Sequence, residues 1–305
     1  MHDHAAQIDP SRVPDPGEPI PRVAWPTVAL CAGSLTVWII AAASAIAGPV
    51  PAWVVIPICA AAAYGLFTVM HDAGHRSAAE VGWVNDWLGR VSAPGVAPPL
   101  AAFPVFRWIH MQHHRFTNHE DGRDPDSWTS NGPAWSWPFR WATLDLRYYV
   151  YYLPNLPGRP RSEKIEFAVN GIAILGTCSA VALAGQLEEL LLFYVLPTRL
   201  TIMFLGFAFD FLPHHGLKAK PDENRYHTTR NRIGLEPVLN AVLLYQNYHA
   251  VHHLHPRVPF YAYLRAWRRN EETYVAQGTP LVTVAGRELG PDEYRSRRDM
   301  KPSGS

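Results

Sequence analysis

Apolar residues gather into four blocks along the chain, and polar segments separate them. The blocks are residues 23–47, 52–70, 165–184 and 187–209. A helix rises about 1.5 Å per residue and the hydrocarbon core of a bilayer is about 30 Å thick, so each block is about long enough to cross a membrane. The pattern therefore predicts four transmembrane helices in place of a soluble domain.

The four blocks form two pairs, because the connection within each pair is very short. These connections, "GPVP" at 48–51 and "GQLEE" at 185–189, contain neither Lys nor Arg, whereas basic residues are frequent between the pairs and after residue 217. By the positive-inside rule, both termini and the long middle segment face the cytoplasm. We therefore expect two helical hairpins. Arg199 lies beside Pro197 in the fourth block, so we expect either a kink there or a guanidinium turned towards protein.

The two ends of the chain differ from the predicted membrane domain, residues 23–285. Residues 1–22 contain five prolines and no apolar run, which predicts a disordered cytoplasmic tail. Residues 286–305 are polar and basic, and we expect them to form a flexible C-terminal tail.

Composition excludes several classes of function. A formal net charge of +1 over 305 residues is too neutral to indicate nucleic-acid binding. The three cysteines are isolated, with no CxxC spacing, so they indicate neither a zinc ribbon nor a disulfide framework. The 15 histidines are the remaining chemical signal.

The histidines cluster where the apolar blocks end. "HDAGH" continues the second block and sets His71 and His75 four residues apart, on one face of a continuing helix. "HMQHH" and "HAVHH" each have an i, i+3, i+4 spacing, and "DFLPHH" places Asp210 four residues before His214 at the end of the fourth block. In the predicted topology all four groups emerge on one side of the bilayer.

Imidazole nitrogens are good ligands for iron, copper and zinc. One zinc needs about four ligands, so nine clustered histidines favour two metal ions, each with an open position. The predicted ligands are His71, His75, His110, His113, His114, His214, His249, His252 and His253.

Four other histidines lie beside these groups but outside the helical spacing: His119, His215, His227 and His255. We leave them outside the ligand set. If one of them replaces a predicted ligand, we expect it to be His215 or His227, because the fourth-block group supplies only one histidine.

Several polar residues near the histidines could orient an imidazole through its other ring nitrogen. The candidates are Asp72, Asp124 and Asp126, although turn formation explains the last two equally well. Asn247 is a further possible donor. Pro256 should end the helix that carries the last box, because the residue before a proline is disfavoured in helical geometry.

These motifs resemble the membrane fatty acid desaturase and hydroxylase superfamily, whose members carry three boxes of the form HxxxH, HxxHH and HxxHH. The resemblance covers about residues 52–267. It implies an all-α integral membrane fold, with four transmembrane helices and a cytoplasmic helical cap that carries the boxes. It also implies a non-haem di-iron centre held by nine histidines, with O2 as co-substrate.

In acyl-CoA desaturases of this superfamily, an asparagine one turn before a histidine of the fourth helix takes part by way of water. Asp210 and His214 fit that spacing, with aspartate in place of asparagine. The role of Asp210 therefore stays open: it could hold a metal-bound water, bind metal directly, or position His214.

Within the superfamily, "HMQHHRFTN", "DPD", "FLPHH" and "NYHAVHHLHPRVPFYAY" look most like the bacterial carotenoid ring hydroxylase branch. The resemblance thus implies O2-dependent hydroxylation of a carotenoid ring, with desaturation of a fatty-acyl lipid as the alternative. The long apolar substrate should arrive from the bilayer, between the helices.

Electrons must come from outside the chain, because it has no HPGG element and no flavin or nicotinamide fingerprint. A ferredoxin or similar carrier with its reductase is implied. An acidic carrier could dock on Arg257, Arg265, Arg268 and Arg269, although the positive-inside bias explains these residues equally well.

Two other classes of protein fit the sequence less well. A membrane zinc hydrolase would need fewer histidines, and "HDAGH" lacks the glutamate of HExxH. A metal transporter or sensor would place its polar residues at mid-membrane, whereas these histidines lie at helix ends.

Overall fold

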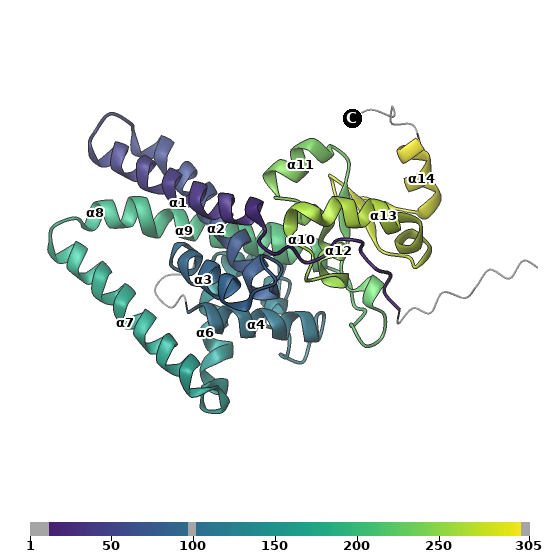
Figure 1. Cartoon of the computed structure of the whole chain (residues 1–305), viewed down its shortest axis with the longest axis horizontal. Coiled ribbons are helices and arrows are strands. Elements are labelled where there is room, and N and C mark those ends of the chain that lie inside the picture. The colour runs from purple at the N-terminus through teal and green to yellow at the C-terminus, as the bar shows by residue number, and fades with distance from the viewer. Residues whose placement is uncertain (1–11, 97–101, 300–305) are drawn as a thin grey trace, which may run out of the picture.

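The computed structural model describes residues 12–96 and 102–299, which are mostly helical (Figure 1). Within them, four helices are long and apolar enough to cross a membrane, as predicted: α1 (Trp25–Ile46), α2 (Ala52–His75), α7 (Arg161–Leu183) and a composite helix over Leu187–His214. The second and fourth end at His75 and His214, beyond the predicted ends at residues 70 and 209, so HDAGH and the His214 of DFLPHH lie on the spanning helices.

The composite helix alternates regular and wider turns. It consists of α8 (Leu187–Leu190), η5 (Leu191–Val195), α9 (Leu196–Leu205), η6 (Gly206–Phe211) and α10 (Leu212–His214), with π-type turns in η5 and η6. Such turns are frequent at functional sites. The Arg199 guanidinium pairs with the buried Asp145 carboxylate, with an Nη1–Oδ1 distance of 2.9 Å. Of the two expectations for Arg199, the charge turned towards protein is the one observed.

Short helices connect the spanning ones. They are α3 (Gly82–Ser92), η1 (Ala93–Gly95), α4 (Phe103–Phe116), η2 (Pro125–Thr129), η3 (Ala134–Ser136), α5 (Trp137–Ala142), α6 (Leu144–Tyr152) and η4 (Leu153–Gly158). Asp145, the partner of Arg199, lies on α6. This ion pair therefore ties the middle segment to the fourth spanning helix.

The C-terminal third contains a small sheet, so the expectation of an all-α fold is corrected. Strands β1 (Asn231–Ile233) and β2 (Leu281–Thr283) pair in parallel, and β3 (Glu288–Leu289) pairs antiparallel with β2. Strands of two or three residues are too short to show an alternating pattern. The helices of this part are η7 (Arg225–His227), α11 (Glu236–Val242), η8 (Gln246–Tyr248), α12 (His249–Leu254), η9 (Phe260–Ala262), α13 (Tyr263–Ala276) and α14 (Pro291–Asp299).

Residues 286–299, the described part of the tail that was expected to be flexible, contain regular structure. Residues 286–299 contain β3 and α14, and Trp267 Nε1 donates to the buried Tyr294 hydroxyl at 3.0 Å. Burial of this aromatic ring offsets the cost of ordering the segment.

At the other end of the chain, residues 12–22 lie against the C-terminal part. Asn270 Nδ2 donates to the Asp15 carbonyl at 2.7 Å, and Arg265 pairs with Glu18 at 2.9 Å. The described part of the predicted disordered tail is thus held by contacts. Residues 1–11 and 300–305 lie outside the described residues.

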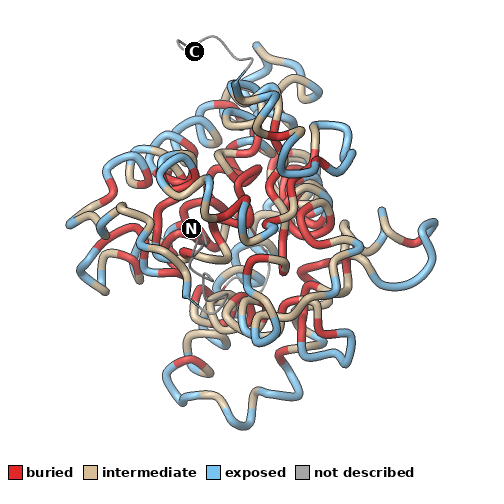
Figure 2. Tube along the Cα trace, turned by 90° about the vertical axis from the view of Figure 1, so that its right-hand side faces the viewer, coloured by how far each residue is buried: buried red, intermediate tan, exposed pale blue. Residues whose placement is uncertain are grey.

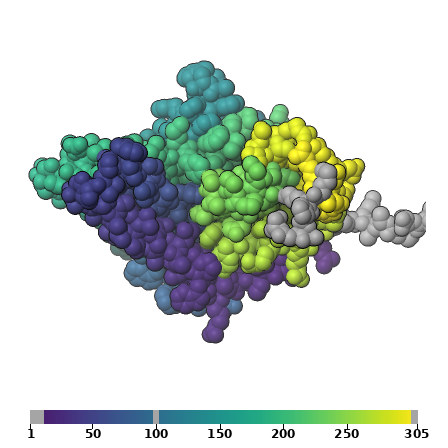
Figure 3. All heavy atoms as spheres, turned by 90° about the horizontal axis from the view of Figure 1, so that it is seen from above, coloured from purple at the N-terminus to yellow at the C-terminus, as the bar shows by residue number. Residues whose placement is uncertain are grey.

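Buried residues concentrate in the interior of the molecule (Figure 2), and Leu66 and Val69 of α2 are fully buried. Both short connections, after α1 and after α7, lie at one end of the molecule, and the C-terminal residues gather at the other end (Figures 1 and 3). Helix α1 packs along α2, whereas α7 leans away from α8 and α9. The second expected hairpin is therefore open.

Candidate metal centre

Helix ends bring the predicted ligands to one place. Helix α2 continues past its apolar part to present His71 and His75, and α10 presents His214. The boxes HMQHH and HAVHH lie on α4 and α12. Helix α12 ends at Leu254, two residues before Pro256, as expected.

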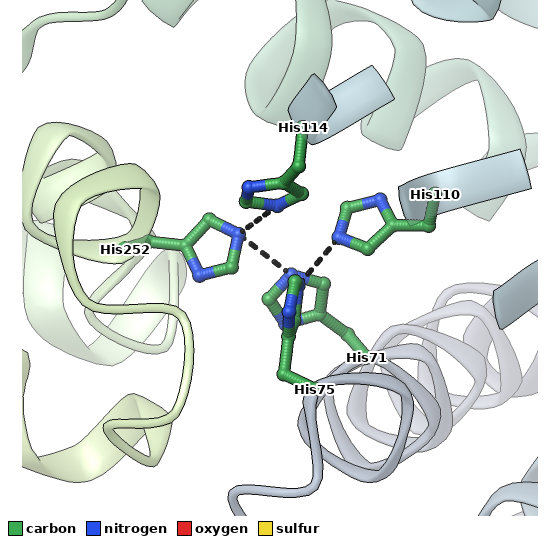
Figure 4. A group of neighbouring side chains, drawn as sticks. All are labelled: His71, His75, His110, His114 and His252. Atoms are coloured by element: carbon green, nitrogen blue, oxygen red, sulfur yellow. Dashed lines mark hydrogen bonds between the residues drawn. The ribbon is translucent and has the colours of Figure 1, made fainter. Parts of the chain in front are cut away.

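The first group contains five imidazoles: His71, His75, His110, His114 and His252 (Figure 4). The Nε2 atoms of His75 and His110 are 2.8 Å apart, and His252 Nε2 lies 3.1 Å from His71 Nε2 and 2.9 Å from His114 Nε2. One ligand nitrogen from each of the five lies within 4.8 Å of the others.

The second group contains the other four predicted ligands: His113, His214, His249 and His253. His249 Nε2 lies 3.1 Å from His214 Nε2 and 3.2 Å from His253 Nε2, and His253 Nε2 is 3.3 Å from His113 Nε2. Each HxxHH box is thus divided. In α4, His110 and His114 belong to the first group and His113 belongs to the second. In α12, His249 and His253 belong to the second group and His252 belongs to the first.

The arrangement of the imidazole nitrogens fits metal coordination better than it fits hydrogen bonds among the imidazoles. A ring nitrogen carries either one hydrogen or one lone pair, yet His252 Nε2 and His249 Nε2 each face two other nitrogens. Hydrogen bonds therefore cannot satisfy every imidazole. Ligand nitrogens about 2.0–2.1 Å from a shared metal lie about 3 Å from one another, which matches the observed separations. The nine residues fit two metal ions.

The protonation state of most of these side chains favours metal binding. Burial lowers the pKa of five imidazoles outside the spanning helices well below its usual range: His110, His114, His249, His252 and His253. These rings are therefore neutral at physiological pH, and each has a lone pair for a metal. His113 differs: burial lowers its pKa, but the Asp126 and Asp124 carboxylates outweigh burial and raise it to about 9.

Asp124 and Asp126 orient His113. His113 Nδ1 donates to Asp124 Oδ1 at 2.9 Å and lies 3.3 Å from Asp126 Oδ2. Asp124 also accepts from the backbone nitrogens of Asn118 and Asp126, and Tyr148 donates to Asp126 Oδ1 at 2.7 Å. With Nδ1–H held by a carboxylate, Nε2 is directed at the second group.

Tyr263 is a functional contact that the sequence did not reveal. Its hydroxyl lies 2.9 Å from His252 Nδ1, and both residues are buried. Tyr263 begins α13, eleven residues after His252, so no helical spacing connects the two. The only signal was the aromatic run that follows the last box.

Two residues that were predicted to orient an imidazole, Asp72 and Asn247, have other hydrogen-bond partners. Asp72 accepts from Thr27 Oγ1 at 3.1 Å and from the Phe260 backbone nitrogen at 3.3 Å. As the neighbour of His71 it projects from a different side of α2, towards α1. Asn247 Nδ2 donates to the Arg232 carbonyl at 3.4 Å. Among the described residues neither hydrogen-bonds an imidazole, which corrects both expectations.

The four histidines left outside the ligand set have other neighbours. His119 contacts Arg123, His227 contacts the Gln277 carbonyl, and His255 Nε2 lies 2.8 Å from the Tyr274 hydroxyl. His215 packs its ring against Trp137 and Phe211. In the part of the chain that the structure describes, none of them belongs to either group.

Asp210 lies between two cavities. The inner cavity is apolar and reaches His110, with Phe67, Ile109 and Leu205 in its walls. The polar cavity reaches His113 and His214 and is bordered by Asp124 and Asp126. Asp210 is buried and lines both.

The chain thus combines four helices of membrane-spanning length with two histidine groups that could each hold a metal ion. Residues 46–285 match the fatty acid desaturase family, and the chain belongs to that family.

Three curated relatives illustrate the range of this family. The chain is 29% identical to dihydrorhizobitoxine desaturase of Bradyrhizobium elkanii, over 65% of this chain and 61% of the relative. It is 27% identical to the chloroplastic sn-2 acyl-lipid omega-3 desaturase (ferredoxin) of Helianthus annuus, over 70% and 55%. It is 28% identical to beta-carotene ketolase of Paracoccus sp., over 65% and 71%. The chain thus covers less than two thirds of the first two relatives.

Proposed function

We propose that this protein is a membrane-bound, non-haem di-iron oxygenase that uses O2 and external electrons to activate C–H bonds of a long apolar lipid. The observation that carries the proposal is the adjacency of two all-histidine groups, the first of which reaches an apolar cavity through His110. Both termini and the metal centre face the cytoplasm in this proposal, by the charge bias of the connections.

Two bound irons would supply reduction of O2 and removal of hydrogen from an unactivated C–H bond. The residues of this chain do the rest. Asp124 fixes the ring of His113, and Tyr263 fixes that of His252. The apolar side chains beside His110 exclude water and hold the reacting carbon. The position of that carbon decides between hydroxylation and loss of a second hydrogen, which gives a double bond.

A carotenoid ring is our first choice of substrate, and a fatty-acyl lipid is the alternative. Support for the first comes from the box sequences and from a relative named as a beta-carotene ketolase. Support for the second comes from relatives named as acyl-lipid desaturases. A zinc hydrolase is disfavoured because nine imidazoles exceed the three protein ligands usual for a catalytic zinc.

The electron donor is proposed to be a ferredoxin or similar carrier with its reductase, as the name of one relative specifies for that protein. Arg257, Arg265, Arg268 and Arg269 are exposed and offer positive charge to an acidic carrier. Arg265 already pairs with Glu18, so the other three are the freer contacts.

Metal analysis of the purified protein tests the class of enzyme. About two irons per chain is the expected result, as one ion per histidine group requires. One zinc and no iron would sink the proposal.

Expression in a host that accumulates β-carotene tests the substrate, with pigments and total fatty acids both analysed. Hydroxylated carotenoid supports the first choice, and a new double bond in an acyl chain supports the alternative. Neither product, from protein that holds iron, would exclude both substrates.

A further inference from the structure

A second cavity lies between α7 and the start of the composite helix. It has a volume of about 410 Å³, and its walls include Pro94, Ala173, Ile174, Leu190 and Tyr194. We call it the outer cavity. Its lining residues come mainly from α7 and from the α8–η5 part of the composite helix, and both are helices of membrane-spanning length. These two helices diverge from one another (Figure 1).

In a bilayer, the outer cavity would lie among the lipid chains. Only 6% of the most apolar window of α7 is buried within the protein, so its apolar side chains face the lipid. The main polar groups of the outer cavity are already bonded: Asn170 Nδ2 donates to the Glu166 carbonyl at 2.9 Å, and the Tyr194 hydroxyl donates to the Pro94 carbonyl at 2.8 Å. The cavity therefore suits an apolar chain and offers little to a polar head group.

A thin wall separates the outer cavity from the inner cavity. Ala93 and Val96 are buried and line the inner cavity, while Pro94 between them lines the outer cavity. Among the described residues, the wall at this point is the single turn η1 with Val96. The Tyr194–Pro94 hydrogen bond joins this turn to η5.

The inner cavity is small for the proposed substrate. Its volume is about 60 Å³, whereas sites for ligands of ordinary drug size have about 300–1,000 Å³. Among the described residues, η1 with Val96 is the part of the lining that separates the inner cavity from the outer one, so a lipid held in the outer cavity reaches His110 if η1 moves.

We propose that the outer cavity is a binding site for the hydrocarbon chain of the substrate lipid, from which the chain passes η1 to reach the inner cavity. That the bound lipid is the substrate of the enzyme rests on the proposed function. The site itself rests on the lining of the outer cavity and on the wall that it shares with the inner one.

Photo-labelling tests the binding site without any need for turnover. The His252→Ala variant, which we expect not to consume its ligand, is placed in phosphatidylcholine nanodiscs with a diazirine-bearing fatty acid, and labelled peptides are located by mass spectrometry. We expect label on residues 170–181 and 190–194. Adding Ala173→Trp, which fills the outer cavity, should lower this labelling several-fold.

The matched control is Ile172→Trp, because Ile172 is the neighbouring residue of α7 but is 74% exposed and does not line the cavity. It should leave the labelling unchanged. Equal labelling in the two tryptophan variants, or cross-links from this face of α7 to a second copy of the chain, would overturn the site. Absence of iron in the wild type would count against the proposed function alone, since the labelling does not depend on metal.

Passage of the lipid chain past η1 is tested with Tyr194→Phe, which removes the hydrogen bond to the Pro94 carbonyl and keeps the aromatic ring. A hydrogen bond of ordinary strength corresponds to about a 2- to 10-fold change in the population of an opened state. We expect product formation at low substrate concentration to rise by that factor with unchanged iron content. Tyr151→Phe is the control, because Tyr151 also donates to a backbone carbonyl but lies at the surface. An unchanged or lower rate in Tyr194→Phe would contradict passage at η1.

Discussion

The two histidine groups face different surroundings. The first group meets the apolar inner cavity through His110, and the second meets the polar cavity through His113 and His214. The rings of His114 and His253, one from each group, stack with centroids 4.2 Å apart. The centre therefore has an apolar side and a polar side, joined by stacked ligands.

The groups also differ in what holds their imidazoles. A neutral hydroxyl, that of Tyr263, contacts His252 of the first group. Two buried carboxylates flank His113 of the second group. A carboxylate raises the basicity of the imidazole that it contacts more than a hydroxyl does. We infer that the two metal positions are unequal, and the following variants test this inference.

The largest effect is expected from His252→Ala. Its Nε2 faces two other ligands of the first group, so its removal should abolish turnover and lower the iron bound per chain. His255→Ala is the control, because His255 contacts Tyr274 outside both groups, and most activity should remain. Equal losses in the two variants would show that the ligand set is wrong.

Asp124→Asn should have the next largest effect. Loss of a carboxylate that orients a ligand typically costs about 10- to 100-fold in metal affinity or activity. Because Asp124 contacts His113 alone among the ligands, iron should be lost first from the second group, leaving about one iron per chain in limiting metal. Asp121→Asn, at an exposed carboxylate paired with Arg123, should retain both irons. Loss of both irons together from Asp124→Asn would contradict unequal positions.

Tyr263→Phe should have a smaller effect on the first group. A hydrogen bond between neutral groups contributes about 0.5–1.5 kcal/mol, and one to a charged group about 1.5–3 kcal/mol. In an iron titration, Tyr263→Phe should therefore lose less iron affinity than Asp124→Asn does. The loss should come from the first group, whereas that of Asp124→Asn comes from the second. A larger loss of iron in Tyr263→Phe than in Asp124→Asn would show that the hydroxyl of Tyr263 supports its ligand more strongly than the carboxylate of Asp124 does.

Local periodicity explains what could be predicted. The apolar blocks and the helical spacing of the boxes were sufficient to predict the spanning helices and to select the nine histidines that the structure brings together. The division into groups was not predicted. It depends on the faces of α4 and α12: His113 lies about 100° around the helix from His114, and only the neighbouring elements decide which group each face meets.

Long-range contacts explain what could not be predicted. The sheet β1–β2–β3 joins segments some 50 residues apart, and α14 is ordered by the contact of Tyr294 with Trp267. Tyr263 was missed for the same reason, since a loop and a helix start bring it to His252. Asp72 follows His71 in sequence, but successive residues of a helix project in different directions, so its carboxylate meets Thr27 and Phe260 and no imidazole among the described residues.

Asp72 supplies the smallest expected effect on the metal centre and a clear effect on stability. Asp72→Ala leaves two buried donors, Thr27 Oγ1 and the Phe260 nitrogen, without their acceptor. A buried donor left unpaired costs about 1–3 kcal/mol, so the free energy of unfolding should fall by about that amount, measured by denaturant or thermal unfolding of the detergent-solubilised protein. Iron per folded chain should stay at the wild-type value, because Asp72 contacts α1 and η9 and no imidazole in the described structure.

Thr27→Val, which removes one donor and keeps the shape of its side chain, should lower the free energy of unfolding by less. If Asp72→Ala instead loses iron while its unfolding free energy is unchanged, Asp72 supports a ligand after all, and the first group has a carboxylate like the second.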